Sequence, residues 1–455
     1  MNGEVSGEMS AAAPLVPQNL ERFPDLHPAL DSQSAAAEAN RCLFCFDAPC
    51  TAACPTHIDV PRFIKKIATG NLRGSALTIL EANILGLSCS RVCPVDVLCE
   101  GSCVMHRYNK KPIEIGLLQR YAMEAFYSSS LPLAPKPPDF VLLSGTFSAR
   151  RDDFVGQVAN LRPIVNRPLG ATFKIACIGA GPASLACAAE LRRHGHSATV
   201  FDRRPLAGGL NTYGVAEYKL RPSDSLREVE MIRGMGVEFQ RADIDLAGLD
   251  KLEKEFDFIF VGAGLGAMDR LGIPGEDLPH VIDALRFIES YKTRPGFAVG
   301  RCVAVIGGGN TAIDAANAAL RMGAAEVHIF YRRTETQMPA FPFEYEHAKV
   351  EGVQFHWLTQ PVEILANRVR FIRTKLTQHD ATGRRQPEPV SGSEFEFACD
   401  MVIPALGQSR MSELKRRVDN KKYFAGGDFV NGGREVVDAV ADGKRAAQAM
   451  LVQHA

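Results

Sequence analysis

The stretch KIACIGAGPASLACAAELRRHGHSATVFD, residues 174–202, decides the fold of most of this chain. It combines a short apolar strand, a glycine turn, an alanine-rich helix and a second strand, the pattern of a parallel βαβ unit. Gly179 permits the tight bend, and Gly181 lets the backbone approach a pyrophosphate at the positive end of the helix. Asp202 ends the second strand, where its carboxylate can accept hydrogen bonds from ribose hydroxyls. The stretch predicts a dinucleotide-binding unit rather than an ordinary βαβ turn.

Small residues complete this first turn, and Ser184 takes the place of the third glycine, so the helix can still pack closely on the strand. Farther along, Gly208-Gly209-Leu210 supplies another glycine-rich turn. The residues that we expect to contact the first dinucleotide are Gly179, Gly181, Pro182, Ala183, Ser184, Asp202, Gly209 and Leu210.

The same pattern recurs at residues 302–330, with a glycine turn that we expect to bind a second dinucleotide. The second strand of this unit ends in Tyr331-Arg332-Arg333 and offers no acid. An arginine pair at that point suits a 2′-phosphate, so we expect NADPH, with solvated surface arginines as the alternative. The residues expected at this site are Gly307, Gly309, Asn310, Thr311, Arg332 and Arg333.

Two further segments indicate which turn binds flavin. Residues 256–264 form an apolar strand ending at Gly264, and residues 423–428 form a strand ending in Gly427-Asp428. They resemble the second and last motifs of the two-dinucleotide flavoprotein fold, in which the last Asp hydrogen-bonds the ribityl chain and the next helix points at the flavin ring. Because the last motif follows the second glycine turn, the nicotinamide domain is inserted in the flavin domain, and the first site is for FAD.

Cysteine supplies a separate signal, since eight of the 12 cysteines lie between Cys42 and Cys103. The two runs are Cys42-x2-Cys45-x4-Cys50-x3-Cys54-Pro55 and Cys89-x3-Cys93-Pro94-x4-Cys99-x3-Cys103. They resemble the two-cluster ferredoxin arrangement and predict two [4Fe–4S] clusters, with a pair of structural zinc sites as the alternative. Three of the other four cysteines lie in expected strands and one in a helix, and all are expected to be small buried hydrophobes: Cys177, Cys187, Cys302 and Cys399.

Composition limits the possible partners and locations of this 455-residue chain. Lys+Arg and Asp+Glu both number 52, so no net basic charge is available to attract nucleic acid or anionic lipid. No apolar run approaches the roughly 20 residues of a membrane span. The N-terminal segment lacks the basic head and apolar core of a secretory signal, and we expect a cytoplasmic protein.

The order of these patterns predicts an α/β protein with a helical iron–sulfur domain in front of two Rossmann-like domains of the two-dinucleotide-binding flavoprotein fold. Helices are expected after an N-cap at Asp31, over residues 61–70 and over residues 73–85. The expected domains are residues 1–150 for the clusters, 151–269 with 400–455 for FAD, and 270–399 for NAD(P).

Together the eight cysteines and the glycine motifs, over about residues 35–450, resemble the amino-terminal half of dihydropyrimidine dehydrogenase and, more distantly, the small subunit of glutamate synthase. The resemblance to the dehydrogenase implies that Gln119 replaces a cysteine as a cluster ligand and that Cys89 has no iron to bind. The implied ligands are Cys42, Cys45, Cys50 and Cys103 for one cluster and Cys54, Cys93, Cys99 and Gln119 for the other.

This resemblance implies the electron-input subunit of a dihydropyrimidine dehydrogenase, which transfers electrons from NAD(P)H through FAD and two [4Fe–4S] clusters. The implied partner carries FMN and iron–sulfur clusters and reduces uracil or thymine to the 5,6-dihydropyrimidine. The alternative is the small (beta) subunit of an NADPH-dependent glutamate synthase or a related ferredoxin-linked oxidoreductase, to which the Tyr-Arg-Arg sequence ending at Arg333 is more similar. A scaffold that retains the fold without catalysis is a further alternative, which the intact glycine turns disfavour.

Overall fold

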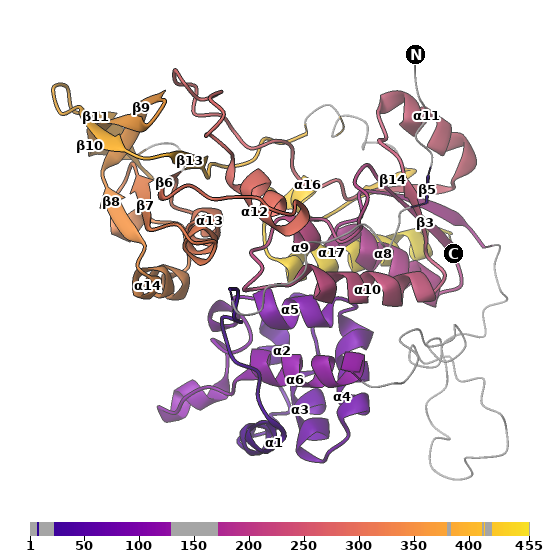
Figure 1. Cartoon of the computed structure of the whole chain (residues 1–455). Coiled ribbons are helices and arrows are strands. Elements are labelled where there is room, and N and C mark those ends of the chain that lie inside the picture. The colour runs from indigo at the N-terminus through magenta and orange to yellow at the C-terminus, as the bar shows by residue number, and fades with distance from the viewer. Residues whose placement is uncertain are drawn as a thin grey trace, which may run out of the picture.

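The computed structural model describes residues 22–128, 172–379, 384–411, 414 and 421–454, together with the short strand β1 (Gly7–Glu8). Helical and mixed α/β regions occupy separate parts of the molecule (Figure 1). The first region ends at residue 128, so the domain boundary expected at residue 150 lies outside the described residues.

The amino-terminal domain is helical and contains all eight clustered cysteines. Asp31 caps the first helix, as expected, by accepting a hydrogen bond from the Ser34 amide at 2.7 Å. Buried Phe63, Ile64 and Ile67 repeat at helical spacing and form part of the domain core. The helices are α1 (Ser32–Asn40), α2 (Pro49–Ala53), α3 (Val60–Ala68), α4 (Leu72–Ala82), α5 (Gly86–Val92) and α6 (Ile115–Ser128), with 3₁₀ turns η1 (Val95–Val97) and η2 (Val104–Tyr108).

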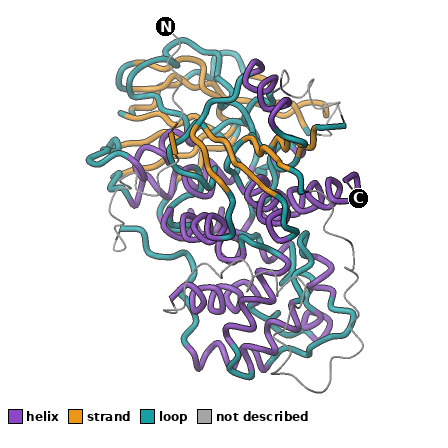
Figure 2. Tube along the Cα trace, turned by 90° about the vertical axis from the view of Figure 1, so that its right-hand side faces the viewer, coloured by secondary structure: helices purple, strands orange, loops and turns teal. Residues whose placement is uncertain are grey.

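The second domain contains a sheet in the order β1-β4-β3-β2-β5-β14, in which only β1 is antiparallel to its neighbour. Its last strand and last helices come from the end of the chain, after the inserted third domain. Helices α8 and α17 pack against each other at this sheet. Figure 2 shows the strands above the helical domain. The elements are β2 (Lys174–Ile178), α8 (Pro182–Arg193), β3 (Ser197–Asp202), α9 (Leu210–Tyr213), α10 (Pro222–Gly234), β4 (Glu238–Arg241), α11 (Leu246–Glu255), β5 (Phe258–Val261), β14 (Tyr423–Ala425), α16 (Asp428–Asn431) and α17 (Val436–His454).

The inserted domain has a parallel sheet in the order β13-β6-β7-β8 and a small antiparallel sheet formed by β9 to β12. Strand β13 pairs with β6 through residues 401–404, which the expected division assigns to the FAD domain. The elements are α12 (Ala284–Thr293), β6 (Cys302–Ile306), α13 (Asn310–Arg321), β7 (Glu326–Tyr331), η4 (Glu335–Gln337), α14 (Pro342–Glu351), β8 (Gln354–Trp357), β9 (Thr359–Leu365), β10 (Arg368–His379), β11 (Arg385–Pro389), β12 (Phe395–Ala398) and β13 (Met401–Pro404).

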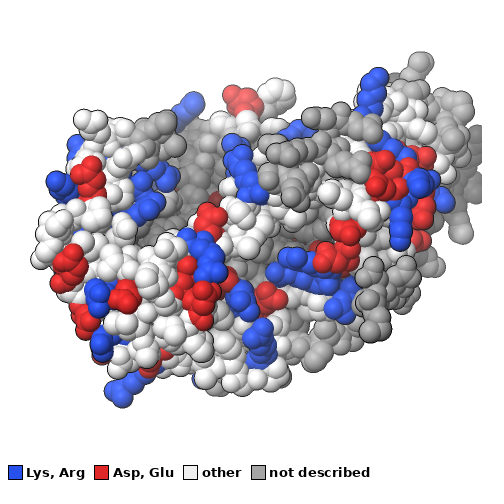
Figure 3. Space-filling view, turned by 90° about the horizontal axis from the view of Figure 1, so that it is seen from above, with Lys and Arg blue, Asp and Glu red and all other residues white. Residues whose placement is uncertain are grey.

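The architecture confirms the predicted fold class, with a helical domain followed by two parallel-sheet domains, one inserted in the other. Among the described residues, no helix has the length and apolar character needed to cross a bilayer. Basic and acidic side chains are interspersed on the face shown in Figure 3, in keeping with their equal numbers in the sequence.

Candidate flavin, coenzyme and cluster sites

The first glycine turn joins β2 to α8 at the carboxyl end of the central strand of its sheet, where ligands bind in open α/β sheets. Gly179 has a φ of 89°, and a Cβ there would lie 2.6 Å from the carbonyl oxygen of Gly262, so only glycine fits. Gly181 precedes α8, and a Cβ on it would meet no protein atom within 4 Å. The helix N-terminus therefore has free space in front of it, as a bound pyrophosphate requires.

Asp202 is held against this turn. Its Oδ2 accepts a hydrogen bond from the Ala180 amide at 2.7 Å, and its Oδ1 accepts one from the Arg204 amide at 2.8 Å. Each carboxylate oxygen has a further lone pair that can accept from a ribose hydroxyl. Ser184 is fully buried, and a Cβ on Gly262 would lie 2.3 Å from its Oγ, so small residues allow the close approach of α8 and β5.

The last motif lies beside the first glycine turn, although more than 240 residues separate them in sequence. A Cβ on Gly427 would lie 2.9 Å from the Cβ of Ala183, and the Gly427 amide donates to Asp442 at 2.9 Å. Asp428 accepts a hydrogen bond from the Arg434 amide at 3.2 Å, and burial raises its pKa. The structure thus brings Gly427 and Asp428 to the expected flavin site.

Two other residues expected at the flavin site lie in turns on either side of it. Gly264 has a φ of 72° and free space around its Cβ direction. Gly209 has a φ of 57°, and a Cβ there would lie 2.7 Å from the Cα of Gly181, so the turn before α9 packs directly on the glycine turn. Leu210 begins α9 and is 37% exposed.

The second glycine turn joins β6 to α13 and repeats the geometry of the first. A Cβ on Gly307 would lie 2.3 Å from the carbonyl oxygen of Ala405, whereas one on Gly309, just before α13, would meet no atom within 4 Å. Asn310 and Thr311 form the first turn of α13, and the Asn310 side chain accepts a hydrogen bond from the Phe341 amide at 2.9 Å. This turn offers the same open helix N-terminus to a phosphate group.

The two arginines expected to bind a 2′-phosphate follow β7 but have different surroundings. Arg332 is exposed. Arg333 is buried, and its Nε donates a hydrogen bond to the carbonyl oxygen of Arg385 at 3.0 Å. Only Arg332 therefore has the exposure that a contact with a coenzyme phosphate requires.

In the helical domain, four cysteines line one cavity: Cys42, Cys45, Cys50 and Cys103. Apolar side chains, including those of Ile64 and Ile115, form the rest of its wall. Burial raises the pKa of the Cys50 thiol to about 12, and the nearby Cys42 and Cys103 thiols add to this effect. These buried thiols resist ionisation when no metal is present. Because a bound metal supplies positive charge, it stabilises them as thiolates, so the four sulfurs fit an iron–sulfur cluster.

A second group of thiols comprises Cys54, Cys89, Cys93 and Cys99. A hydrogen bond with Cys89 and burial raise the pKa of the Cys93 thiol, to which Cys99 and Cys54 also contribute. Cys89 is 2% exposed, and its sulfur accepts a hydrogen bond from the Asn83 side-chain amide at 3.2 Å. The group also fits a cluster, and two of its sulfurs have polar partners, Cys89 with Asn83 and Cys54 with the Thr56 hydroxyl at 3.3 Å.

Gln119 lies on α6 and contacts the start of α5, the helix that contains Cys89. Its Nε2 donates a hydrogen bond to the carbonyl oxygen of Gly86 at 2.7 Å, and the residue is buried. One turn earlier, the Gly116 amide donates to the Glu100 carboxylate at 2.9 Å, so this face of α6 packs against the loop that contains Cys99. Since the Nε2 is anchored to Gly86, the side-chain oxygen is the free coordinating atom of Gln119.

The cluster domain docks directly on the flavin domain, which the spacing of motifs did not predict. Buried Glu228 on α10 accepts hydrogen bonds from the amides of Leu87 and Ser88 at 2.8 and 3.1 Å and a further one from the Ser88 hydroxyl. Arg193 and Lys444 donate to carbonyl oxygens at the end of α4, at 2.7 Å to Leu80 and 2.6 Å to Ala82. Glu228 satisfies free amides at the start of α5, and the bases Arg193 and Lys444 at the end of α4 match the dipole of that helix.

Burial raises the pKa of the Glu228 carboxyl to about 8, with hydrogen bonds from Ser88 and Leu87 opposing the shift. The sequence signal that could have revealed the role of Glu228 is weak, because a glutamate in a helix ordinarily lies in solvent.

The burial of one cysteine also differs from the expectation: Cys177, Cys187 and Cys399 are buried, but Cys302 is only partly buried.

This combination of fold and sites defines a flavin- and iron–sulfur-dependent NAD(P)H oxidoreductase. Residues 19–131 match the family described as dihydropyrimidine dehydrogenase domain II, 4Fe-4S cluster, and residues 173–443 match the pyridine nucleotide-disulphide oxidoreductase family. The two matches support [4Fe–4S] clusters, FAD and NAD(P)H as the cofactors. The chain belongs to the pyridine nucleotide-disulphide oxidoreductase family, in the group that carries this cluster domain at the amino-terminal side.

Several known proteins are similar to this chain. The NADPH glutamate synthase small chain of Escherichia coli is 34% identical, over 94% of this chain and 93% of its own length. The beta subunit of the NADP(+)-dependent formate dehydrogenase of Moorella thermoacetica is 35% identical over 88% of this chain, which spans only 59% of that subunit. A solved structure of FprA from Mycobacterium tuberculosis has a TM-score of 0.52 at 18% identity, covering 62% of this chain and 85% of FprA, and supports the fold.

Proposed function

We propose that this chain is the electron-input subunit of a hetero-oligomeric oxidoreductase and that its coenzyme is NADPH. FAD supplies the chemistry that converts a hydride into single electrons, and the clusters supply a path for single electrons to a partner. The observation that carries the proposal is the direct docking of the cluster domain on the flavin domain through Glu228, Arg193 and Lys444. The cluster domain is thereby held at a fixed position beside the flavin domain.

The residues proposed for each role follow the sequence expectations. FAD would contact Gly179, Gly181, Pro182, Ala183, Ser184, Asp202, Gly209, Leu210, Gly264, Gly427 and Asp428. NADPH would contact Gly307, Gly309, Asn310, Thr311 and Arg332, while buried Arg333 would support the strand end. The domain division that accompanies this proposal ends the inserted nicotinamide domain at Pro404.

For the clusters, we propose Cys42, Cys45, Cys50 and Cys103 as one ligand set, which agrees with the cavity that these four residues line. Cys54, Cys93, Cys99 and Gln119 form the proposed second set. One contact favours Gln119 as a ligand: its amide nitrogen is anchored to Gly86, which leaves the side-chain oxygen to coordinate iron.

The exit for electrons is proposed at the loop that contains Cys42 and Cys45. Leu43 and Phe46 on this loop are 53% and 106% exposed, unusual for large apolar side chains. A partner that covered them would approach the first cluster closely. The relatives described above are themselves a small chain and a beta subunit, which favours a partner of this kind.

Two partner enzymes were considered from the sequence. The comparisons favour the alternative, a glutamate synthase or related enzyme, because the small-chain relative matches nearly the whole of this chain. A pyrimidine-reducing partner is the second candidate, favoured by the description of the matching cluster-domain family.

The test is to copurify the chain with its native partner and to measure NADPH oxidation that depends on the acceptor substrate. Added glutamine with 2-oxoglutarate should stimulate oxidation in a glutamate synthase, and uracil should stimulate it in a dihydropyrimidine dehydrogenase. The chain alone should oxidise NADPH only with an artificial acceptor. Substrate-dependent oxidation by the chain without a partner would contradict the proposal.

A further inference from the structure

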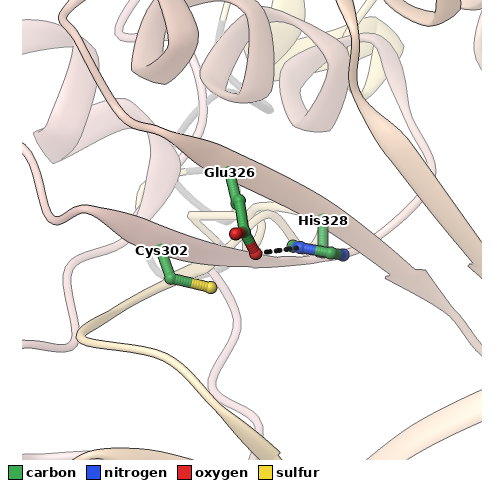
Figure 4. A group of neighbouring side chains, drawn as sticks. All are labelled: Cys302, Glu326 and His328. Atoms are coloured by element: carbon green, nitrogen blue, oxygen red, sulfur yellow. Dashed lines mark ion pairs between the residues drawn. The ribbon is translucent and has the colours of Figure 1, made fainter.

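A group of potential metal ligands lies in the nicotinamide domain, far along the chain from the clustered cysteines. Cys302 begins β6 and Glu326 begins β7, and the two residues are partners in the parallel ladder, so their side chains lie on the same face. His328 is two residues further along β7 and shares this face. Figure 4 shows the three side chains converging, with an ion pair drawn from Glu326 to His328. One ligand atom from each of the three residues lies within 4.8 Å of the other two.

The group is accessible to ions from solvent. Cys302 and Glu326 line a surface pocket together with Arg301, Cys399 and Asp400. The Glu326 side chain is 63% exposed and can move, whereas the His328 side chain is 6% exposed and fixed among aromatic rings. Asp400 accepts hydrogen bonds from the Arg301 and Cys302 amides, so its carboxylate has structural partners within the pocket.

His328 has the hydrogen bonding of a metal ligand. Its Nδ1 lies 3.0 Å from the Nε2 of His356, so one of these two ring nitrogens donates a hydrogen bond to the other. When Nδ1 donates to His356, Nε2 carries a lone pair directed at the Glu326 carboxylate, 3.5 Å away. Nε2 is buried and has no hydrogen-bond partner among the described residues. In that tautomer the Nε2 lone pair and the carboxylate repel each other, and a cation bound between them would remove the repulsion.

We propose that Cys302, Glu326 and His328 form a zinc site with water as the fourth ligand. Thiolate, imidazole and carboxylate are the ligand types that Zn²⁺ takes in proteins, and three protein ligands leave one position open. In a tetrahedral site the ligand atoms lie about 3.5 Å apart, so a modest movement of the exposed Glu326 side chain brings the three ligand atoms to the separation that zinc requires. His356 then orients His328 from behind, the arrangement that fixes metal-bound histidines.

The site lies away from the coenzyme. Cys302 and Glu326 are at the amino ends of their strands, whereas Gly307 follows the carboxyl end of β6. A five-residue strand separates these two edges of the sheet by roughly 16 Å. Bound zinc would therefore join β6 to β7 and stabilise the nicotinamide domain without contacting NADPH.

The test uses anaerobically purified holoenzyme and Zn²⁺ alone, added in competition with a chromophoric chelator. Iron is measured in parallel, because cysteines that have lost a cluster also bind zinc. Wild type should bind about one zinc per chain, and Cys302→Ser and His328→Gln should bind none at this site. Glu326→Gln should weaken binding roughly 10- to 100-fold, while His347→Gln, a control on α14, should match wild type.

A second readout separates metal binding from misfolding. Saturating zinc should raise the melting temperature of wild type and of His347→Gln but not that of Cys302→Ser, because only a protein that binds the metal in its folded state is stabilised. NADPH oxidation with an artificial acceptor should be the same in all these variants without zinc. Equal zinc affinity in wild type, Cys302→Ser and His328→Gln, or no zinc binding by wild type at micromolar concentrations, would overturn the proposal.

Discussion

Replacement of Glu228 tests whether the cluster and flavin domains form one unit. In Glu228→Ala, the Leu87 amide, the Ser88 amide and the Ser88 hydroxyl lose their common acceptor in a buried interface. Each unsatisfied buried donor costs about 1–3 kcal/mol, so the free energy of unfolding should fall by at least about 3 kcal/mol. Glu228→Gln retains an acceptor oxygen and nearly the same volume, and at pH 6 it should lose less than about 1 kcal/mol.

The pH dependence gives a second measure of the same contact. Burial raises the pKa of Glu228 from 4.5 to about 8, so the folded protein binds a proton more tightly than the unfolded chain does. The carboxyl therefore contributes its full stability below pH 4.5, and this contribution declines as the pH rises to about 8. The whole decline is on the order of 5 kcal/mol, and it should be absent in Glu228→Gln.

Both effects can be followed by anaerobic urea unfolding at pH 6 and pH 8, with circular dichroism and cluster absorbance as probes. The matched control is Glu230→Gln, which changes a half-exposed glutamate on the same helix that pairs with Arg233 near the surface. Stopped-flow mixing of Glu228→Ala with NADPH should show normal flavin reduction and slower cluster reduction. The reasoning is refuted if Glu228→Ala unfolds like the control, or if Glu228→Gln has the same pH dependence as wild type.

Three further predictions concern the proposed ligands and coenzyme contacts. Cys89→Ser should retain about eight iron atoms per chain and Cys99→Ser roughly half, as assayed by iron content; iron loss in Cys89→Ser would exclude Gln119 as the replacement ligand. Arg332→Ala should raise KM for NADPH roughly tenfold or more with little effect on NADH, since it removes one charged contact; equal effects would make Arg332 a surface charge. At Gly181 and Gly309 a Cβ would meet no protein atom, so Gly181→Val and Gly309→Val should both fold. Gly181→Val should fail to bind FAD, whereas Gly309→Val should bind FAD that NADPH reduces slowly. Retention of FAD by Gly181→Val would show that FAD binds at a different site.

The structural features that could be predicted from the sequence are those that local residue patterns determine. The glycine turns before α8 and α13 and the Asp31 cap each depend on residues within a few positions of one another. The runs from Cys42 to Cys54 and from Cys89 to Cys103 likewise indicated clusters through spacing alone. Such signals are visible in sequence because the backbone geometry of a turn or loop determines them directly.

The remaining features depend on contacts between distant segments. Glu228 meets Leu87 across 141 positions, and buried Arg333 donates a hydrogen bond to Arg385 of the antiparallel sheet, 52 positions away. Cys302 was expected to be buried because its strand is apolar, yet it lies at the amino end of β6, where a pocket opens. Tertiary packing sets the exposure of each of these side chains, and no local periodicity encodes it.

Electron transfer from NADPH through FAD to the clusters can be tested directly by anaerobic titration of the reconstituted chain with NADPH, followed by visible and electron paramagnetic resonance spectroscopy. We expect one FAD and about eight iron atoms per chain, bleaching of the flavin by NADPH, and a reduced [4Fe–4S] signal that Cys99→Ser diminishes. Flavin that NADPH does not bleach, or flavin that bleaches while the clusters stay oxidised even with a low-potential partner present, would contradict this expectation.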